Sequence, residues 1–381
     1  MVMGLKKVVK KGLIGDMSFA KEAGAINWFP GHMAAATRAI RSRLKLSDLV
    51  IEVRDARIPL SSANEDLQPQ LSAKRRIIAL NKKDLANPNV LNKWTRHFES
   101  EKQDCVAINA HSRSSVKKLL DLVEFKLKEV IAREPTLLVM VVGVPNVGKS
   151  ALINSVHQIA ATRFPVKDRL KRATVGPLPG VTQDIAGFKI AHRPSIYVLD
   201  SPGVLVPSIP DIETGLKLAL SGSVKDSVVG EERLAQYFLA ILNTRGTPLH
   251  WKYLFEGRNN EGSSHPDSID KPSYNLKDLR HQRSKQPDSS AVHYVGGVIS
   301  EVQRSLYTTL SEFDGDIEDE NDLECLIEQQ FEALQKALKV STRASSEARL
   351  MVSKKFLTLF RTGRLGPFIL DDVPETDEPS L

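Results

Sequence analysis

The sequence predicts an α/β fold in which a domain with a phosphate-binding loop precedes a small all-helical domain. Three observations support this prediction. A complete Gly-x-x-x-x-Gly-Lys-Ser motif at 143–150 follows an apolar run, an Asn-Lys-x-Asp motif at 81–84 comes earlier in the chain, and the residues after Gly203 show helical spacing. The two motifs occur in the reverse of their usual order, so the α/β domain is expected to be circularly permuted.

Hydrophobic spacing defines the individual elements. In the first expected helix, for example, Ala35, Ala39, Ile40 and Leu44 form the apolar stripe. Short runs rich in Val, Ile and Leu are typical of buried strands. The expected strands cover 48–54, 77–80, 106–108, 136–142 and 195–199, and the expected helices cover 32–46, 114–131, 231–242, 322–338 and 345–360.

The motif at 143–150 has the context that a phosphate loop requires, because a strand precedes it and a possible helix start at 151–156 follows. Its glycines let successive backbone N–H groups surround phosphate oxygens at a helix N-terminus. A chance match on a turn is the alternative, and the flanking elements weigh against it. We expect Lys149 to reach the β- and γ-phosphates and Ser150 to bind Mg²⁺. The other nucleotide contacts of this loop are expected from Asn146, Val147, Gly148 and Ala151.

The motif Asn81-Lys82-Lys83-Asp84 follows the apolar strand at 77–80 and is expected to read a guanine base. The Asp84 carboxylate can accept hydrogen bonds from both the N1–H and the exocyclic amine of guanine, whereas adenine offers no such pair of donors. Asn81 can join neighbouring loops, and the Lys82 stem can cover the base. A solvated charged turn would look the same in isolation, so the prediction depends on the strand and on the phosphate loop.

Three further segments complete the expected site. The strand at 106–108 ends at Asn109 and Ala110, which are placed to contact the guanine carbonyl. The strand at 195–199 ends in Asp200-Ser201-Pro202-Gly203, where the aspartate can hold a Mg²⁺-bound water and the Gly203 N–H can meet the γ-phosphate. Between these lies the Gly- and Pro-rich loop 176–184, whose Thr182 is the candidate for a second Mg²⁺ ligand; an ordinary surface loop is the alternative.

Together these motifs predict a circularly permuted P-loop GTPase (Ras-like) domain that uses GTP/GDP and Mg²⁺. Their order resembles that of the circularly permuted ribosome-assembly GTPases. The residues Asn-Trp-Phe-Pro-Gly-His-Met at 27–33 and Asp-Ala-Arg at 55–57 look like the signatures of the DAR-type branch, the YlqF-type family. The resemblance is strong over 26–203 and weak beyond it. It implies GTP hydrolysis, Mg²⁺, and maturation of the large ribosomal subunit with its rRNA, in the mitochondrion, with plastid or cytoplasm as alternatives.

The resemblance also bears on hydrolysis. Many GTPases place a water-orienting glutamine after the Asp-x-x-Gly motif, but this chain has Val204 there. Two replacements are implied. Asn146 matches the asparagine that holds K⁺ near the phosphates in similar enzymes, and His32 matches a histidine that the bacterial relative brings to the nucleotide on the ribosome. A helix cap is the alternative role for His32.

Composition places few limits on function. The 381 residues suggest two domains, and a net charge of +7 with a pI near 9.2 permits RNA binding without proving it. With only Cys105 and Cys325, no disulfide framework and no cysteine zinc site is expected. No apolar run approaches the ~20 residues of a membrane span. We expect a monomer without a transmembrane segment and leave peripheral membrane association open.

The expected organisation has four parts. Residues 1–25 form a basic extension, either a targeting segment or an RNA-binding arm, and 26–206 form the permuted GTPase domain. Residues 207–370 form the helical domain with a disordered insertion at about 256–290, and 371–381 form an acidic tail. Two groups of basic residues suggest RNA-binding surfaces, although such groups are more often solvated faces. The first comprises Arg163, Lys167, Arg169, Lys171 and Arg172, and the second, near the C-terminus, comprises Lys354, Lys355, Arg361 and Arg364.

The sequence therefore predicts a GTP-hydrolysing assembly factor for the large ribosomal subunit. The permuted order takes the chain from Gly203 directly into the helical domain, so the switch would be coupled to a C-terminal RNA- or ribosome-binding domain. The alternative is a GTP-dependent protein-binding switch with negligible hydrolysis.

Overall fold

The structure is a computed structural model of the chain, and it forms two compact units that are described separately below. The sheet unit comprises Ile14–Phe238 and Phe356–Leu381, and the helical unit comprises Met1–Leu13 and Leu239–Lys355. The division falls at 238/239 and 355/356, within two helices. The boundary at 206/207 between the GTPase domain and the helical domain stays a prediction. The residues that the structure describes are 14, 17, 26, 28–131, 134, 136–163, 186–192, 195–207, 209, 211–256, 289–341 and 345–374.

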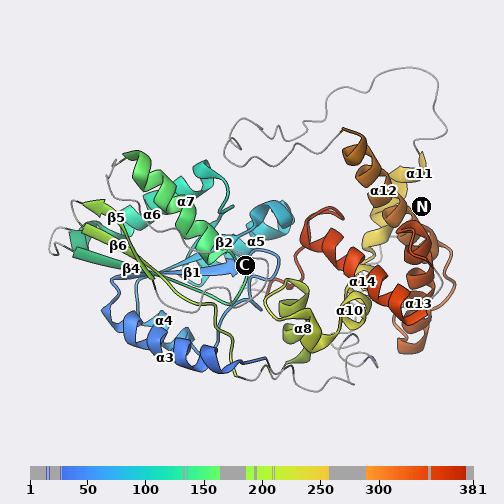
Figure 1. The fold of residues 1–381 in the computed structure, drawn as a ribbon, viewed down its shortest axis with the longest axis horizontal. Helices are drawn as coiled ribbons and strands as arrows, with labels where there is room; N and C mark the ends of the chain where they lie inside the picture. The colour runs from blue at the N-terminus through green and yellow to red at the C-terminus, as the bar shows by residue number, and fades with distance from the viewer. Residues whose placement is uncertain are drawn as a thin grey trace, which may run out of the picture. The chain divides into compact units, whose positions relative to one another are not determined.

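A six-stranded sheet with the order β3-β2-β1-β4-β6-β5 is the centre of the sheet unit (Figure 1). The first five strands in this order run parallel, and β5 pairs antiparallel with β6 at the edge. This confirms the predicted α/β fold. The strands are β1 (Leu49–Asp55), β2 (Arg76–Asn81), β3 (Asp104–Ala107), β4 (Thr136–Val142), β5 (Ala186–His192) and β6 (Ser195–Asp200).

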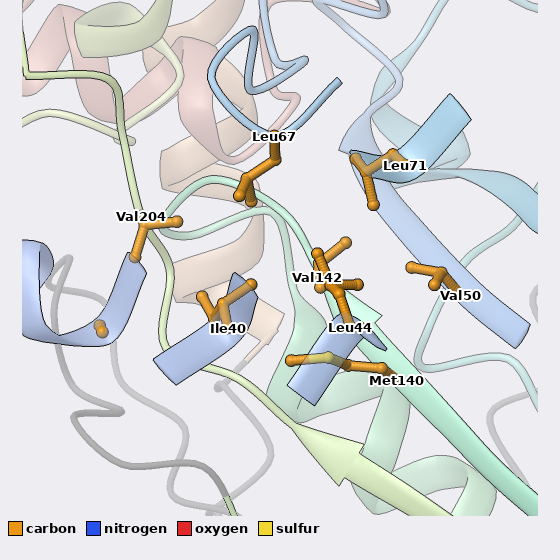
Figure 2. Packing of buried hydrophobic residues seen from close by; sticks show 9 residues of the cluster. Ile40, Leu44, Val50, Leu67, Leu71, Met140, Val142 and Val204 are labelled. Carbon is orange, nitrogen blue, oxygen red and sulfur yellow. The ribbon is translucent and has the colours of Figure 1, made fainter. Parts of the chain in front are cut away.

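Helices cover both faces of the sheet, with α3 (Gly31–Leu46) and α4 (Gln68–Ser72) on one face and α6 (Arg113–Ile131) and α7 (Lys149–Arg163) on the other (Figure 1). The expected apolar stripe of α3 is only partly right, because Ala35 and Ala39 are exposed. Figure 2 shows the core beneath this helix, formed by Ala36, Ile40, Leu44, Val50, Leu67, Leu71, Met140, Val142 and Val204.

A second core cluster lies under the short helix α5 (Pro88–Ser100), which packs Trp94 and Phe98 against residues of β2. The helix begins with Asn87 at the N-cap, whose side chain accepts hydrogen bonds from two backbone N–H groups, and with Pro88 in the first turn. Both are strong start signals. They support a helix at 88–100 that spacing alone did not predict.

The strand order changes direction between β1 and β4. From β1 the chain proceeds to β2 and β3, whereas from β4 it proceeds to β6 on the other side. In open α/β sheets such a reversal opens a crevice at the carboxyl ends of the two strands, where ligands bind. The loops after β1 and β4 are therefore placed at the expected ligand site.

The chain end returns to the sheet unit. Backbone N–H groups of Phe368 and Leu370 donate to the carbonyls of Leu85 and Arg57, at 3.1 and 2.7 Å. Asp371, assigned to the acidic tail from sequence, is buried and accepts from the Ser61 hydroxyl at 2.6 Å. The elements that complete this unit are the turn η1 (Lys83–Leu85), α8 (Ile212–Leu220), α9 (Asp226–Val229), and parts of α10 (Glu231–Thr244) and α14 (Ser345–Arg361).

The helical unit confirms that the C-terminal region is helical. The side-chain amides of Asn243 and Gln330 are buried and donate to each other at 2.8 Å in both directions, so neither is left unsatisfied. Within the described ranges, no helix is long and apolar enough to cross a membrane. Most of the predicted insertion at 256–290 lies outside the described residues. The elements are η2 (Thr247–Lys252), α11 (Tyr253–Glu256), α12 (Ser289–Ser311), α13 (Glu320–Ala337) and the remainders of α10 and α14.

Candidate functional site

Four loops meet at the carboxyl edge of the sheet, each following one of four adjacent strands. The strand β2 ends at Asn81, β1 at Asp55, β4 leads into the loop at 143–148, and β6 ends at Asp200. Because these strands are parallel, their carboxyl ends lie side by side. The structure thus brings together the predicted base-reading loop, the phosphate loop and the Asp200 loop.

The backbone of the phosphate loop requires glycine at two positions. A Cβ on Gly148, whose φ is +95°, would lie 2.3 Å from the Asn81 Nδ2 atom, and one on Gly143 would lie 2.3 Å from the Val53 carbonyl oxygen. Asn146 adopts φ 60°, a left-handed conformation that asparagine tolerates better than most residues. The loop is therefore closely packed against the neighbouring strand ends.

Lys149 begins helix α7 and is 6% exposed. Its ammonium group donates to the Val144 carbonyl at 2.9 Å, which holds the side chain over the loop. Burial lowers the pKa of Lys149 to about 8, although the nearby Asp200 carboxylate opposes this shift. A buried cation with a single carboxylate neighbour is suited to receiving an anionic phosphate.

Nucleotide affinity is expected to fall as the pH rises above about 8, because phosphate contact requires protonated Lys149. Bound phosphate would raise the lysine pKa, so binding should take up a proton above that pH, and affinity should fall up to about tenfold per pH unit. Titrations with fluorescent GDP between about pH 7 and pH 9 check this. Calorimetry in two buffers of different ionisation enthalpy counts the proton directly, and an affinity independent of pH in this range would contradict the assignment of Lys149.

The Asp200 carboxylate and the nearby Ser150 hydroxyl are oxygen groups suited to Mg²⁺ and its bound water. Burial raises the pKa of Asp200, while Lys149 and a hydrogen bond from Ser150 lower it. The Ser150 hydroxyl lies 3.3 Å from one carboxylate oxygen, and the other, Oδ1, is buried without a hydrogen-bond partner among the described residues. An unsatisfied buried acceptor beside a serine hydroxyl fits an ion with its water shell.

Gly203 follows in the same loop and lies against the phosphate loop. A Cβ there would lie 2.5 Å from the Pro145 Cα and 3.0 Å from the Lys149 Nζ atom. Only glycine therefore fits, and its backbone N–H stands beside the loop that would hold the phosphates. Thr182, predicted as a second Mg²⁺ ligand, and the loop 176–184 around it lie outside the described residues.

The base-reading loop is fixed by Asn81. Its amide donates to the Val147 carbonyl at 2.8 Å and accepts from the Ala110 backbone N–H at 2.9 Å, so one side chain joins three loops. Lys83 donates its backbone N–H to the Ile108 carbonyl, and Asp84 is exposed within η1. Exposure leaves the Asp84 carboxylate accessible to a base.

The loop after β3 contains Asn109 and Ala110, which are expected to contact the guanine carbonyl. In this structure both residues form hydrogen bonds within the protein. The Asn109 side chain accepts from the His111 backbone N–H at 2.8 Å, and the Ala110 N–H is bonded to Asn81. Both groups thus shape the loop in this structure. Their contact with the guanine carbonyl stays a prediction.

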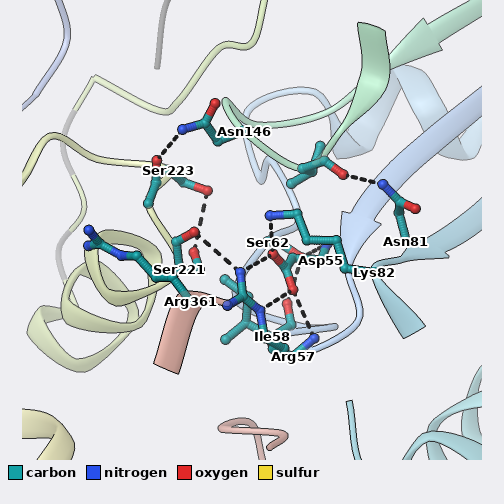
Figure 3. A network of polar contacts seen from close by, with 12 residues as sticks. Asp55, Arg57, Ile58, Ser62, Asn81, Lys82, Asn146, Ser221, Ser223 and Arg361 are labelled. Carbon is teal, nitrogen blue, oxygen red and sulfur yellow. Dashed lines mark hydrogen bonds and ion pairs between the residues drawn. The ribbon is translucent and has the colours of Figure 1, made fainter. Parts of the chain in front are cut away.

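A buried ion pair at the end of β1 adjoins the predicted base-reading loop, although sequence reasoning gave its residues Asp55 and Arg57 no site role. Asp55 is bonded to Arg57 and to Lys82, and Arg57 also donates to the Ser221 carbonyl at 3.3 Å (Figure 3). The available signal was position, since Asp55 follows a buried strand as Asn81 does.

The segment Ser221–Ser223 was also missed, and it contacts the phosphate loop from a distant part of the chain (Figure 3). The Asn146 amide donates to the Gly222 carbonyl at 2.9 Å, and the Ser223 hydroxyl donates to the Pro145 carbonyl at 2.8 Å. These contacts span more than seventy residues of sequence and use backbone carbonyls, which no motif marks.

Val204, at the position of the usual glutamine, and His32, one of the two expected replacements for that glutamine, have contrasting surroundings. Val204 is 1% exposed and points into the core with Ile40 (Figure 2), so its side chain is unavailable to a water at the phosphates. His32 is exposed in the first turn of α3; Pro30 occupies the N-cap position, and no side-chain hydrogen bond caps the helix. The capping alternative for His32 therefore has no hydrogen bond to support it.

Comparisons with known proteins identify the family of the chain. A family model described as "50S ribosome-binding GTPase" matches residues 138–247. The chain is 90% identical over 377 residues to "Short integuments 2, mitochondrial" of Arabidopsis thaliana, covering 99% of this chain and 97% of that protein. It is 42% identical over 351 residues to "DAR GTPase 2, mitochondrial" of the same plant, covering 91% and 90%. It is 41% identical over 226 residues to "Mitochondrial ribosome-associated GTPase 1" of Mus musculus, covering 58% and 67%.

Proposed function

Because the chain belongs to the circularly permuted DAR-type GTPases, we propose that it is an assembly factor for the large subunit of the mitochondrial ribosome. The chain is a GTPase and is mitochondrial. The observation that carries the proposal is the meeting of the phosphate loop, the Asn81 loop and Asp200 at one edge of the sheet. The name of the mouse relative, a ribosome-associated GTPase, suggests that the partner is the ribosome.

In this proposal GTP or GDP lies along the carboxyl edge of the sheet. Asp84 accepts from the guanine base, with Lys82 beside it, and Lys149 contacts the β- and γ-phosphates. Ser150 and Thr182 would hold Mg²⁺, with Asp200 binding one of the ion's waters, and the ion would offset phosphate charge. The unpartnered Oδ1 atom of Asp200 supports this arrangement.

Hydrolysis requires a water-orienting group from outside the Asp200 loop, because Val204 is packed in the core. We place His32 in this role when the protein is bound to the ribosome. The histidine is exposed at the start of α3, and its segment is held to the chain beyond Gly203 by a bridge between Ile26 and Ile209. A histidine on such a segment can be moved when a partner binds.

The route from the phosphate loop to the C-terminal helix supports a coupled switch. Ser221–Ser223 contacts the loop, and the residues just before and after this segment contact Arg361 of α14. Arg361 donates to the carbonyls of Ala219 and Leu220 at 2.9 and 3.0 Å. It also forms a bidentate ion pair with Asp226, with both hydrogen bonds at 2.7 Å. A change at the phosphates can therefore reach α14 through direct contacts.

These contacts change the expected basic surface. Arg361 is bound to Asp226 and to backbone carbonyls, so it is a poor candidate for RNA contact. Lys354, Lys355 and Arg364 are exposed and remain candidates. The other basic run, from 163 to 172, lies mostly outside the described residues.

Stimulated turnover tests the proposal against the alternative of a protein-binding switch with negligible hydrolysis. Alone, the protein should hydrolyse GTP slowly, on the order of 10⁻⁴ s⁻¹, as small GTPases do without an activating group. Large subunits purified from mitochondria should raise the rate of phosphate release, whereas small subunits should not. Slow turnover that large subunits leave unchanged would favour the alternative.

Turnover is expected to be faster in K⁺ than in Na⁺ at equal ionic strength if the Asn146 amide oxygen helps to hold K⁺ near the phosphates. The left-handed backbone at Asn146 and its bond to Gly222 fix where the amide lies. Asn146→Ala should remove the difference between the two salts and leave GDP affinity largely intact. Equal rates of the parent protein in both salts would reject the ion site.

A matched variant separates loss of the ion from loss of the contact to Ser221–Ser223. Ser223→Ala removes a second hydrogen bond between this segment and the phosphate loop but keeps the Asn146 amide. The preference for K⁺ should therefore survive in Ser223→Ala. If it disappears in both variants, the effect arises from anchoring of the segment.

A further inference from the structure

The Asp55 side chain lies between the base-reading loop and the phosphate loop. It is 1% exposed at the carboxyl end of β1, the strand between β2 and β4. Its Oδ2 atom accepts from the Lys82 Nζ atom at 2.8 Å. Lys82 belongs to the motif that reads the base, so a residue on the neighbouring strand fixes the position of its ammonium group.

We infer that Asp55 is a positioning residue for the guanine site, which holds Lys82 in its base-binding conformation before the nucleotide arrives and is itself held by Arg57. The inference rests on the proposed role of the Asn81–Asp84 loop in binding guanine. It assigns a function to the Asp-Ala-Arg motif, which is otherwise only a signature.

The carboxylate of Asp55 is fully satisfied, which fixes its orientation. The Oδ1 atom accepts from the backbone N–H and the Nε atom of Arg57, both at 3.0 Å, and Oδ2 accepts from Arg57 Nη2 and from Lys82, both at 2.8 Å. Four donors saturate the lone pairs of a carboxylate. Rotation of Asp55 would break several buried hydrogen bonds, so the position that it offers to Lys82 is well defined.

Arg57 also has contacts beyond Asp55. It is 2% exposed, donates to the Ser221 carbonyl, and places its guanidinium 5.2 Å from the centre of the Phe360 ring. Arginine suits this role because its planar fork matches a carboxylate and stacks on an aromatic ring. The backbone carbonyl of Arg57 also accepts from the Leu370 N–H at 2.7 Å, so the motif is held from the chain end as well.

Lys82 needs such support for two reasons. Its backbone has φ 62°, a left-handed conformation that is uncommon for lysine. Its side chain has a flexible four-carbon stem, which would otherwise have to be ordered when the nucleotide binds. Ordering one long side chain in advance is worth about 3- to 10-fold in affinity.

The electrostatics agree with this geometry. Burial would raise the pKa of Asp55, but Arg57 and Lys82 outweigh burial and hold that pKa well below its usual value. Burial lowers the pKa of Lys82, and Asp55 opposes that shift. The carboxylate is therefore ionised at neutral pH, as the ion pair with Lys82 requires.

The chain contains a matched control on the same strand. Glu52 is also 1% exposed, and its carboxylate accepts from Arg54, Gln68 and Arg76. It resembles Asp55 in burial, in strand and in its four hydrogen bonds, but it does not contact Lys82. Glu52→Gln therefore reports what the loss of a buried carboxylate does to the sheet alone.

The test is a double-mutant cycle on GDP affinity, measured with fluorescent GDP on the full chain. Asp55→Asn should weaken GDP binding about 3- to 10-fold relative to Glu52→Gln. In a Lys82→Met background, Asp55→Asn should weaken binding by less than about twofold further, because the residue it positions is gone. A purely structural Asp55 would weaken binding by the same factor in both backgrounds, or no more than Glu52→Gln does, and either result overturns the inference.

If Asp55→Asn does not fold, Asp55→Glu takes its place in the cycle. It retains the charge but moves the carboxylate by one methylene, so the same loss of affinity and the same dependence on Lys82 are expected. Full GDP affinity in Asp55→Glu would overturn the inference. Asp84→Asn in the same titration separates the guanine site from the role of Asp55. If Asp84→Asn leaves GDP affinity unchanged, the assignment of the guanine site is wrong. If Asp84→Asn weakens GDP binding but the Asp55 variants do not, the role of Asp55 is refuted.

Discussion

Replacing Asp84 by asparagine is expected to weaken GDP binding by about 30- to 1,000-fold, which corresponds to about 2–4 kcal/mol. The carboxylate would accept hydrogen bonds from two guanine donors, and an amide presents a donor to one of them instead. Asp84 is exposed in η1, so the change should affect the empty protein little. Titration with fluorescent GDP, together with the melting temperature of the variant, measures both effects.

Two controls make this result specific. Asp121→Asn makes the same chemical change at an exposed position on α6 and should leave GDP affinity unaltered. Xanthine has a carbonyl where guanine has its exocyclic amine, so Asp84→Asn should bind XDP better than the parent does. GDP affinity equal to that of the parent would refute the assignment of the base-reading loop.

Replacing His32 by alanine is expected to remove most of the hydrolysis that large subunits stimulate, by about 100-fold or more, which is the range of general acid–base contributions. Subunit binding in the GTP state should persist, because the side chain is exposed and no hydrogen bond to the helix start is lost. Single-turnover phosphate release with saturating large subunits measures the effect. His250→Ala, which truncates an exposed histidine of the helical unit, should hydrolyse GTP as the parent does.

The result for His32 has two informative alternatives. A variant that no longer associates with subunits would show that the histidine serves binding and not chemistry. A variant that large subunits stimulate as strongly as the parent would leave His32 without a catalytic role. The activating group would then be another part of this chain or a group of the partner, because Val204 is packed in the core.

The sequence predicted the motif loops because each has a local cause. The phosphate loop needs glycine where the chain adopts positive φ or passes close to another strand, as at Gly148. Glycines at this fixed spacing can be recognised in the sequence. Parallel strands then place every motif that follows a strand at the same edge. The position of Asp55 after a buried strand carried this signal too, although its partners could not be inferred.

Contacts between distant segments could not be predicted from the sequence. Asn146 bonds to the carbonyl of Gly222, and any residue can offer a carbonyl. Asp371 lies in a stretch whose acidic composition suggests a tail, yet its carboxylate accepts from Ser61 and is buried. The face of α3 was partly misassigned for a similar reason, since alanines occur on buried and exposed faces alike.

The central claim is that the nucleotide state of this GTPase governs its association with the large mitochondrial ribosomal subunit. Co-sedimentation tests it most directly: the protein is loaded with a non-hydrolysable GTP analogue or with GDP and centrifuged with purified large subunits. The account predicts that the GTP-analogue form pellets with the subunits and that the GDP form stays in the supernatant. Equal pelleting of the two forms, or none of either, would contradict it.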